Sequence, residues 1–291
     1  MTTARVLVVG ASGYVGRQLA ALGGFPNARW VGRRAGVPLP GYVAVPRYDE
    51  SSLAPHVRGQ DVVLHLAALT RGRREAAMRE ANVETTRRLA ATLRRHNPDA
   101  RVIFASSDLA SHGLSPYGRS KREAEDLLLA AGLDAVVLRA PTICGMPVPA
   151  LTSSMQALKA MAARGTVPAP NGGRFAMRPL WIEDLAAVLG RLADRKGRAE
   201  DRGLWSAFGR PVGYDALIRT FAAQAGRRAR IVPVPASLLA AAGRLLAAVN
   251  PDTAFPLDFL EAIGREPAHP PDVFAHLGLA PREPEAYLPM I

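Results

Sequence analysis

An apolar strand that runs directly into a glycine-rich turn is the feature that most constrains how this chain can fold. Val6–Val9 are consecutive apolar residues, which is typical of a central parallel strand covered by helices on both faces. Gly10, Gly13 and Gly16 follow at three-residue intervals. Because these residues lack Cβ atoms, the turn can bend tightly, a diphosphate can approach the backbone, and the next helix can pack on the strand. A helix predicted over 14–22 would direct its free N–H groups at that diphosphate.

The rest of the chain alternates apolar runs with amphipathic stretches, which predicts a parallel sheet covered by helices. We expect strands near 4–9, 28–32, 43–45, 61–66, 101–106 and 134–139, and helices near 14–22, 73–95 and 116–131. After Pro141, many Pro and Gly residues interrupt this pattern. The predicted fold class is α/β, a Rossmann-type doubly wound parallel sheet over 1–144 with a return segment at about 179–210. A smaller C-terminal substrate-binding lobe would take 145–178 and 211–291.

A second group of polar residues follows a later apolar strand. Ser106 and Ser107 end the run RVIFASS, and Tyr117 and Lys121 lie four residues apart in YGRSK. This spacing places Tyr117 and Lys121 on one face of a helix, within reach of each other and of a ligand. Such a pair alone is often a solvated helix face, and three glycines alone can be a structural turn. Their occurrence together, in this order, indicates an active site.

These motifs resemble those of the extended short-chain dehydrogenase/reductases, the group that includes epimerases, dehydratases and ketoreductases. The resemblance covers nearly the whole chain, although the glycine spacing is G-x-x-G-x-x-G rather than G-x-G-x-x-G. The shared segments, in the family's order, are GASGYVG (10–16), DVVLHLAA (61–68), ANVETTRRLA with Asn82, FASSD (104–108), YGRSK (117–121), LRAPTICG (138–145) and RPLWIEDLA (178–186).

The resemblance implies a hydride transfer, in which a positioned acid must deliver a proton to the developing alkoxide. Tyr117 would be the proton donor or acceptor. Lys121 would lower the pKa of Tyr117 by its charge and anchor a cofactor ribose. Ser107 would hold the substrate oxygen, and Ser106 would take that role if the register were shifted by one residue. Both serines could also be simple caps of the strand end.

The end of the second strand bears on the choice of cofactor. An acidic residue there binds the ribose hydroxyls of NAD, whereas basic residues accommodate the 2′-phosphate of NADP. The sequence ARWVGRR places Arg33 and Arg34 at this point, which favours NADP(H), with NAD(H) as the alternative. The two arginines could also be ordinary loop residues. The resemblance adds further expected cofactor contacts at Gly10, Ser12, Gly13, Tyr14, Val15, Gly16, Ala67, Ala68 and Pro141.

Three features of the family are altered in this chain. Asp49 is the acid nearest to the family's adenine-contacting aspartate, but it is displaced by several positions. Ser111 and His112 replace a Tyr-Gly pair in SSDLASHG and would change the wall of the pocket. Asp108 matches the acid that expels water in the family's dehydratases, but Leu109 follows it where those enzymes have a glutamate, which disfavours a dehydratase.

The expected substrate-binding residues include two arginines of the second lobe. Arg174 and Arg178 precede WIEDLA, near the place where relatives bind the diphosphate of a nucleotide sugar through an arginine. Asp108, His112 and Ser106 could also contact the substrate, and Asp108 and His112 could instead cap the loop after Ser107. No metal site is expected.

The function implied by the resemblance is NADPH-dependent reduction of a keto group on a nucleotide sugar or a similar small molecule. One alternative is an NAD-dependent nucleotide-sugar 4-epimerase, which returns its cofactor whereas a reductase consumes it. An alternative from another class is a non-catalytic NADP(H)-binding subunit. Relatives of that kind commonly lose the Tyr or the Lys, and this chain has both Tyr117 and Lys121.

The composition agrees with an enzyme that acts on a small molecule. The 291 residues are 48% hydrophobic, enough to bury a large core. The formal net charge is +12, but the arginines are scattered without a basic run, so no nucleic-acid partner is expected. The single cysteine, Cys144, excludes an intramolecular disulfide and a cysteine-based metal cage.

The sequence also bears on location and assembly. The apolar stretch 236–249 is shorter than the roughly 20 residues of a membrane-spanning helix and contains Arg244. Arg5 leads into a strand rather than a secretion signal. We therefore expect a cytoplasmic enzyme with no membrane partner. Many relatives dimerise through two helices beside the active site, here near 73–95 and 116–131, so a homodimer is the expected assembly.

Overall fold

The computed structural model describes residues 2–70, 75–145, 153–249 and 269–290. Its centre is a seven-stranded sheet in the order β11-β6-β5-β4-β1-β2-β3, in which every neighbouring pair is parallel. This order is that of a Rossmann fold and confirms the predicted fold class. The strands are β1 (Val6–Val9), β2 (Ala28–Gly32), β3 (Tyr42–Ala44), β4 (Val62–His65), β5 (Arg101–Ser107), β6 (Asp134–Ala140) and β11 (Gly203–Ser206).

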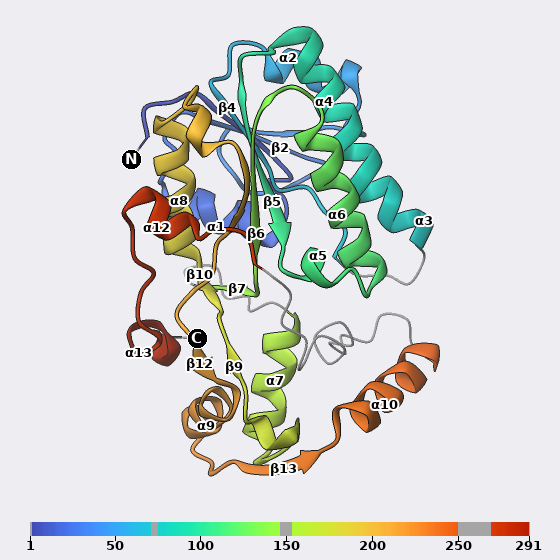
Figure 1. Ribbon diagram of the computed structural model, residues 1–291, viewed down its shortest axis with the longest axis vertical. Coiled ribbons are helices and arrows are strands. Elements are labelled where there is room, and N and C mark those ends of the chain that lie inside the picture. The colour runs from blue at the N-terminus through green and yellow to red at the C-terminus, as the bar shows by residue number, and fades with distance from the viewer. Residues whose placement is uncertain (1, 71–74, 146–152, 250–268, 291) are drawn as a thin grey trace.

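Helices cover both faces of the sheet (Figure 1). On one face, α1 (Tyr14–Leu22) and α8 (Ile182–Asp194) pack on the strands, and on the other lie α2 (Glu50–Val57), α4 (Thr85–His96) and α6 (Pro116–Leu129). Strand residues therefore contribute alternately to two cores: Phe104 of β5 belongs to one, and Ile103 to the other. Burial on both faces explains why β1 is apolar throughout.

The helix expected near 73–95 is divided in the structure. A short helix α3 (Glu75–Met78) passes into a π-helical turn, η1 (Arg79–Glu84), before α4 begins. Extra turns of this kind are frequent at functional sites. Here the turn carries Asn82, whose buried side chain lies between two segments of the candidate site described below.

A third core cluster lies beyond the carboxyl ends of the strands, in the lower half of Figure 1. Its main elements are α7 (Ser153–Ala163), α9 (Tyr214–Gln224) and the parallel pair of β8 (Thr166–Pro170) and β13 (Arg230–Val234), followed by α10 (Ala236–Val249). Shorter strands join this part to the sheet region. They are β7 (Ile143–Cys144) paired with β10 (Leu180–Trp181), and β9 (Ala176–Met177) paired with β12 (Val212–Gly213).

The remaining described helices are short. They are α5 (Leu109–His112) after β5, α12 (Val273–Leu277) and α13 (Pro284–Tyr287), with 3-10 turns η2 (Asn171–Gly173), η3 (Ala199–Asp201) and η4 (Leu288–Met290). Within the described ranges no helix is long and apolar enough to cross a membrane.

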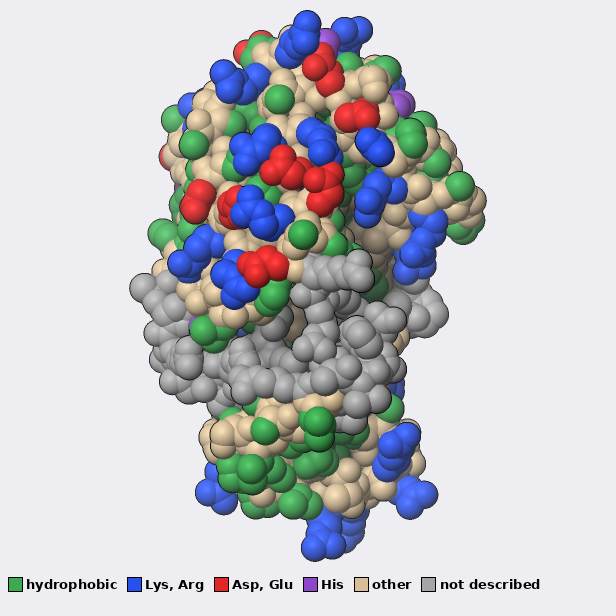
Figure 2. All heavy atoms as spheres, turned by 90° about the vertical axis from the view of Figure 1, so that its right-hand side faces the viewer, with side chains coloured by type: hydrophobic (Ala, Val, Ile, Leu, Met, Phe, Trp, Pro, Cys, Tyr) green, Lys and Arg blue, Asp and Glu red, His purple; other side chains and the backbone are tan. Residues whose placement is uncertain are grey.

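The outer face of α3, η1 and α6 carries charges of both signs. The upper part of Figure 2 shows Lys and Arg side chains interspersed with Asp and Glu on this side of the molecule. Two ion pairs join the helices directly, Arg79–Glu123 at 2.6 Å and Arg119–Glu75 at 3.1 Å. The helices expected to form a dimer interface are therefore also tied to each other within one chain.

Candidate active site

The glycine turn after β1 has the geometry that a dinucleotide requires. Gly10 has φ +96°, and a Cβ on it would collide with the backbone of Ala67, whose Cα would lie 2.6 Å away. A Cβ on Gly16 would lie 2.6 Å from the Cα of Ala11. Gly13 immediately precedes α1 and has no side chain to cap it, so the first N–H groups of that helix point at the turn. These features fit the diphosphate of a pyridine nucleotide.

Two side chains of α1 contact the carbonyl of Gly145, a residue to which the sequence assigned no role. Gln18 donates from Nε2 to the carbonyl of Gly145 at 3.0 Å, and the Tyr14 hydroxyl donates to the same carbonyl at 3.4 Å. Tyr14, an expected cofactor contact, therefore connects the glycine turn to the segment that follows β6 and β7. No local pattern in the sequence marks this contact.

Asn82 connects the loop after β4 with α6. Its Oδ1 accepts from the Leu69 nitrogen at 2.7 Å, and its Nδ2 donates to the Leu69 carbonyl at 3.0 Å and to Ser120 Oγ at 2.8 Å. The loop contains Ala67, which is buried, and Ala68, which is exposed. Asn82 thus holds two expected cofactor contacts in a set position relative to the helix that carries Tyr117.

The two serines at the end of β5 face opposite sides of the sheet. Ser106 is buried, and its hydroxyl donates to the carboxylate of Glu125. Ser107 is half-buried, and its Oγ accepts from the Leu109 nitrogen at 3.3 Å, which leaves its O–H group able to donate. Of the two hydroxyls, only that of Ser107 is therefore open to a substrate oxygen.

The local sequence determines where α6 begins. Ser115 caps the helix by accepting from the Gly118 nitrogen at 3.0 Å, and Pro116 occupies the first turn, as both residue types favour. Tyr117 therefore lies in the first turn, where it is half-buried, and Lys121 lies one turn later. Lys121 is only 1% exposed.

The Lys121 amine lies against the end of β5. Its Nζ donates to the Ala105 carbonyl at 2.6 Å and sits 4.0 Å from the centre of the Phe104 ring. Burial lowers the pKa of Lys121 to about 7, and the nearby carboxylate of Glu125 opposes this shift. The structure thus places an amine with a lowered pKa at the strand end that carries Ser107.

A neutral histidine completes the surroundings of this amine. His65 at the end of β4 stacks on Phe104 at 4.9 Å, and its Nε2 lies 2.8 Å from Thr86 Oγ1. Because that hydroxyl donates to the Asn82 carbonyl at 2.7 Å, it must accept from Nε2–H. Burial, and then the charge of Lys121, lower the pKa of His65 to about 3.

The two arginines after β2 are exposed. Within the described part of the chain neither forms an ion pair with an acid, although Arg33 lies 5.8 Å from the centre of the Tyr48 ring. A Cβ on Gly32 would come within 2.9 Å of Ser12 Oγ, so the strand end adjoins the glycine turn. Asp49 caps α2 by accepting from the Ser52 nitrogen at 3.0 Å.

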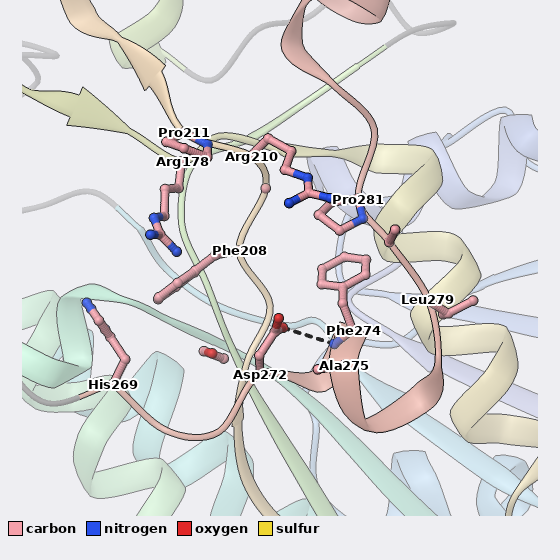
Figure 3. A pocket seen from close by; sticks show the side chains of 13 residues that line it. Arg178, Phe208, Arg210, Pro211, His269, Asp272, Phe274, Ala275, Leu279 and Pro281 are labelled. Carbon is pink, nitrogen blue, oxygen red and sulfur yellow. Dashed lines mark hydrogen bonds between the residues drawn. The ribbon is translucent and has the colours of Figure 1, made fainter.

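Beyond the carboxyl end of β11 lies a cavity of about 490 Å³. Figure 3 shows the guanidinium of Arg178 directed toward Phe208 and His269 across this cavity. Arg210 also lines it and pairs with Glu283 at 3.2 Å. The expected residue Arg178 is thus part of the cavity wall, whereas Arg174 is exposed outside it.

His269 links the cavity to the strand end beside Ser107. Its Nδ1 lies 3.6 Å from Asp108 Oδ1, and its ring meets Phe208 edge-on at 4.9 Å. The Asp108 nitrogen donates to the Ala140 carbonyl at 3.0 Å, so this aspartate lies next to Pro141, the expected contact after β6. His269 is far from these residues in the sequence, and no motif predicted its place here.

The family can be assigned by comparison with known proteins. The model of the NAD dependent epimerase/dehydratase family matches residues 6–202, which is more than half of the chain. The chain belongs to this family. This is the family that the resemblance implied.

Individual relatives agree with this assignment. A UDP-2-acetamido-2,6-beta-L-arabino-hexul-4-ose reductase from Pseudomonas aeruginosa is 31% identical over 148 residues, which are 48% of this chain and only 36% of the reductase. MoeE5 in complex with UDP-glucuronic acid and NAD is 26% identical, with a TM-score of 0.62 over 79% of this chain and 87% of its own.

A UDP-glucose 4-epimerase from Thermotoga maritima shares the fold over almost the full length. It has a TM-score of 0.72 over 98% of this chain and 96% of its own, at 18% identity.

Proposed function

We propose that this enzyme is a cytoplasmic NADPH-dependent reductase of a keto group on a nucleotide sugar or a similar small molecule. The observation that carries the proposal is the placement of Lys121. Its amine is buried against the carboxyl end of β5, one helical turn from Tyr117 and near Ser107. This is the arrangement that proton delivery to a developing alkoxide requires.

Each polar residue then has a distinct task. Tyr117 donates the proton to the substrate oxygen, and Ser107 hydrogen-bonds that oxygen through its free O–H group. Lys121 stabilises the tyrosinate that remains, and its buried position strengthens this effect because the surroundings have a low dielectric constant. When bound, NADPH supplies the hydride. The turn that contains Gly10 and Gly16 would hold its diphosphate, and a side chain at either position would collide with the backbone of Ala67 or Ala11 and distort that turn.

The preference for NADPH is supported by Arg33 and Arg34. Both are exposed at the end of β2, beside the glycine turn, and neither is neutralised by a described acid. A guanidinium is suited to a terminal phosphate because it offers several N–H donors in a planar fork. MoeE5 was solved with NAD, so the cofactor choice is a property to be tested in this chain.

The cavity beyond β11 supports an anionic substrate. Arg178 provides a guanidinium there that pairs with no acid among the described residues, and the aromatic ring of Phe208 provides a surface on which a base or sugar could stack. Two of the relatives are named for UDP-sugar substrates or ligands. A nucleoside diphosphate would place its charge by Arg178 and leave the sugar directed toward Asp108 and Ser107.

The test is Tyr117→Phe, assayed beside wild type with a panel of UDP-4-keto sugars. Wild type should oxidise one NADPH for each ketone reduced, measured as the loss of absorbance at the nicotinamide band. Tyr117→Phe should lose turnover by at least about a hundredfold, because general acid catalysis is typically worth that much. Its affinity for NADPH, measured by fluorescence titration, should stay within about threefold.

The control is Tyr287→Phe, which removes a long hydrogen bond of 3.4 Å to the Pro179 carbonyl and should keep turnover. Conversion of the sugar without net oxidation of NADPH would instead identify an epimerase. Tight NADPH binding with no turnover of any ketone by wild type would identify a non-catalytic subunit.

A further inference from the structure

A buried carboxylate lies one helical turn beyond Lys121. Glu125 is 1% exposed and accepts from three groups. Arg139 of β6 donates from Nη2 to Oε2 at 2.6 Å and from Nε to Oε1 at 3.0 Å, and Ser106 donates to Oε1. The carboxylate therefore joins α6, β5 and β6 at a point behind the proposed catalytic residues.

The same chain of contacts reaches the wall of the site. The remaining guanidinium nitrogen of Arg139, Nη1, donates to Ser111 Oγ at 3.1 Å. Ser111 belongs to α5, the short helix that follows Ser107. Arg122 of α6 holds the same helix by donating to the Ala110 carbonyl at 2.7 Å. The strand end that carries Ser107 is thus fixed on α6 from both sides.

Glu125 is also the acid that acts on Lys121. Of the described residues around the amine, Phe104 and Ala105 of β5 are apolar and His65 of β4 is neutral. The other titratable groups are Tyr117 and Glu125 of α6 itself and Arg139 of β6, which lies behind Glu125. Burial favours the uncharged amine, and the carboxylate of Glu125 opposes it. Glu125 thereby counteracts the effect of burial on the pKa of Lys121.

We propose that Glu125 is a positioning residue that favours the charged form of the Lys121 amine and holds Ser107 in place relative to α6 through Ser106. The catalytic consequence rests on the proposed reductase function. The effect of Glu125 on the charge of Lys121 does not rest on that function, and it can be measured without any substrate. The two claims can therefore fail separately.

The chain offers a direct measurement because it contains only three lysines, Lys121, Lys159 and Lys196. Protein labelled with ¹³C and ¹⁵N in lysine should give three side-chain NMR signals, two of which are assigned with Lys159→Arg and Lys196→Arg. A pH titration of the third signal gives the pKa of Lys121. The other two lysines serve as internal references, since an effect confined to Glu125 leaves them unchanged.

Glu125→Gln should lower the pKa of Lys121 by about one unit or more, the usual effect of removing a neighbouring opposite charge. The matched control is Glu123→Gln on the same helix, where the side chain is 39% exposed and pairs with Arg79. This variant should leave the pKa of Lys121 unchanged. Glu125→Asp keeps the charge and should restore most of the wild-type value, which a purely structural role would not predict.

A second variant covers the case in which Glu125→Gln does not fold, because it leaves Arg139 buried without its partner. The double replacement Glu125→Met/Arg139→Met removes the whole pair, a change that folded proteins often tolerate. The pKa of Lys121 should again fall, but by less, since the repelling guanidinium is removed too. An unchanged pKa of Lys121 in either folded variant overturns the proposal. A lowered pKa in an enzyme that reduces no ketone would refute only the reductase function.

Discussion

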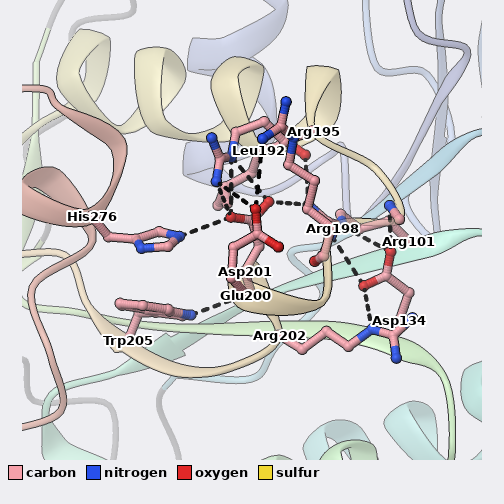
Figure 4. Close-up of polar contacts among 11 residues, drawn as sticks. Arg101, Asp134, Leu192, Arg195, Arg198, Glu200, Asp201, Arg202, Trp205 and His276 are labelled. Atoms are coloured by element: carbon pink, nitrogen blue, oxygen red, sulfur yellow. Dashed lines mark hydrogen bonds and ion pairs between the residues drawn. The ribbon is translucent and has the colours of Figure 1, made fainter.

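Replacing Arg101 should destabilise the protein without affecting its cofactor site. Arg101 begins β5, at the end of the sheet opposite Ser107, and is completely buried (Figure 4). All five N–H groups of its guanidinium are used. They donate to both oxygens of Asp134, to Asp201, and to the carbonyls of Leu192 and Arg198, at distances between 2.8 and 3.2 Å.

The expected loss of unfolding free energy depends on the hydrogen-bond partners that Asp134 and Asp201 retain after Arg101→Met. Asp134 retains Arg202 at 3.2 Å, and Asp201 retains Arg195 and His276, each at 2.8 Å. Burial raises the pKa of Asp201, but the hydrogen bonds from Arg195, Arg101 and His276 outweigh it and hold that pKa well below its usual range. Since neither carboxylate is left alone, the loss should lie at the lower end of the range for breaking a buried pair, about 3 kcal/mol.

The assay is urea unfolding followed by tryptophan fluorescence. Trp205 reports on this cluster, since its Nε1 donates to the Asp201 carbonyl at 2.8 Å. The control is Arg198→Met, whose side chain is 58% exposed and 3.6 Å from Glu200; it should change the unfolding free energy by less than about 0.5 kcal/mol. The affinity for NADPH should stay at the wild-type value in both variants. A loss below about 1 kcal/mol for Arg101→Met would refute the reasoning.

Three further predictions concern the cofactor turn and the pH dependence. Replacing Arg33 and Arg34 together by serine should weaken NADPH binding at least about tenfold, the value of one charge-assisted hydrogen bond, while NADH affinity stays the same; an equal loss for both cofactors in fluorescence titrations would contradict this. A side-chain hydrogen bond from Arg5 lowers the pKa of Asp61 from 3.8 to about 2, so its contribution to stability should be complete above pH 3.8 and lost as the pH falls toward 2. Urea midpoints of Asp61→Asn and wild type should therefore converge over that interval rather than stay parallel. Gly10→Ala should abolish measurable NADPH binding, because its Cβ would enter the Ala67 backbone at positive φ; wild-type affinity would show that the turn has another purpose.

Much of the sheet domain could be predicted from local sequence. The strand over 28–32 and the helix over 14–22 have the predicted ends, and α6 begins at Pro116 as expected. These elements depend on short-range rules, such as continuous apolar runs, a Ser cap and Pro in the first turn. The sequence did not reveal β11 within the expected return segment, because a four-residue strand at a sheet edge has too little pattern of its own.

In the candidate site, too, some residues could be predicted from local sequence and others could not. The positions of Gly10, Tyr117 and Lys121 in the turn and the helix follow from motifs a few residues long. The sequence left open whether Ser106 or Ser107 serves the substrate, and it marked neither His269 nor Phe208 for a role. These residues owe their places to partners many positions away, which no local spacing records.

The sequence by itself determined the Rossmann-type fold and the family, because a strand, a glycine turn and a Tyr-Lys helix each have strict local requirements. Only the tertiary structure decided which serine is free, which arginine lines the cavity, and how far the Lys121 amine is from neutral. Those properties depend on burial and on side chains such as Glu125 and Arg139, which come from different elements and meet only in the folded chain.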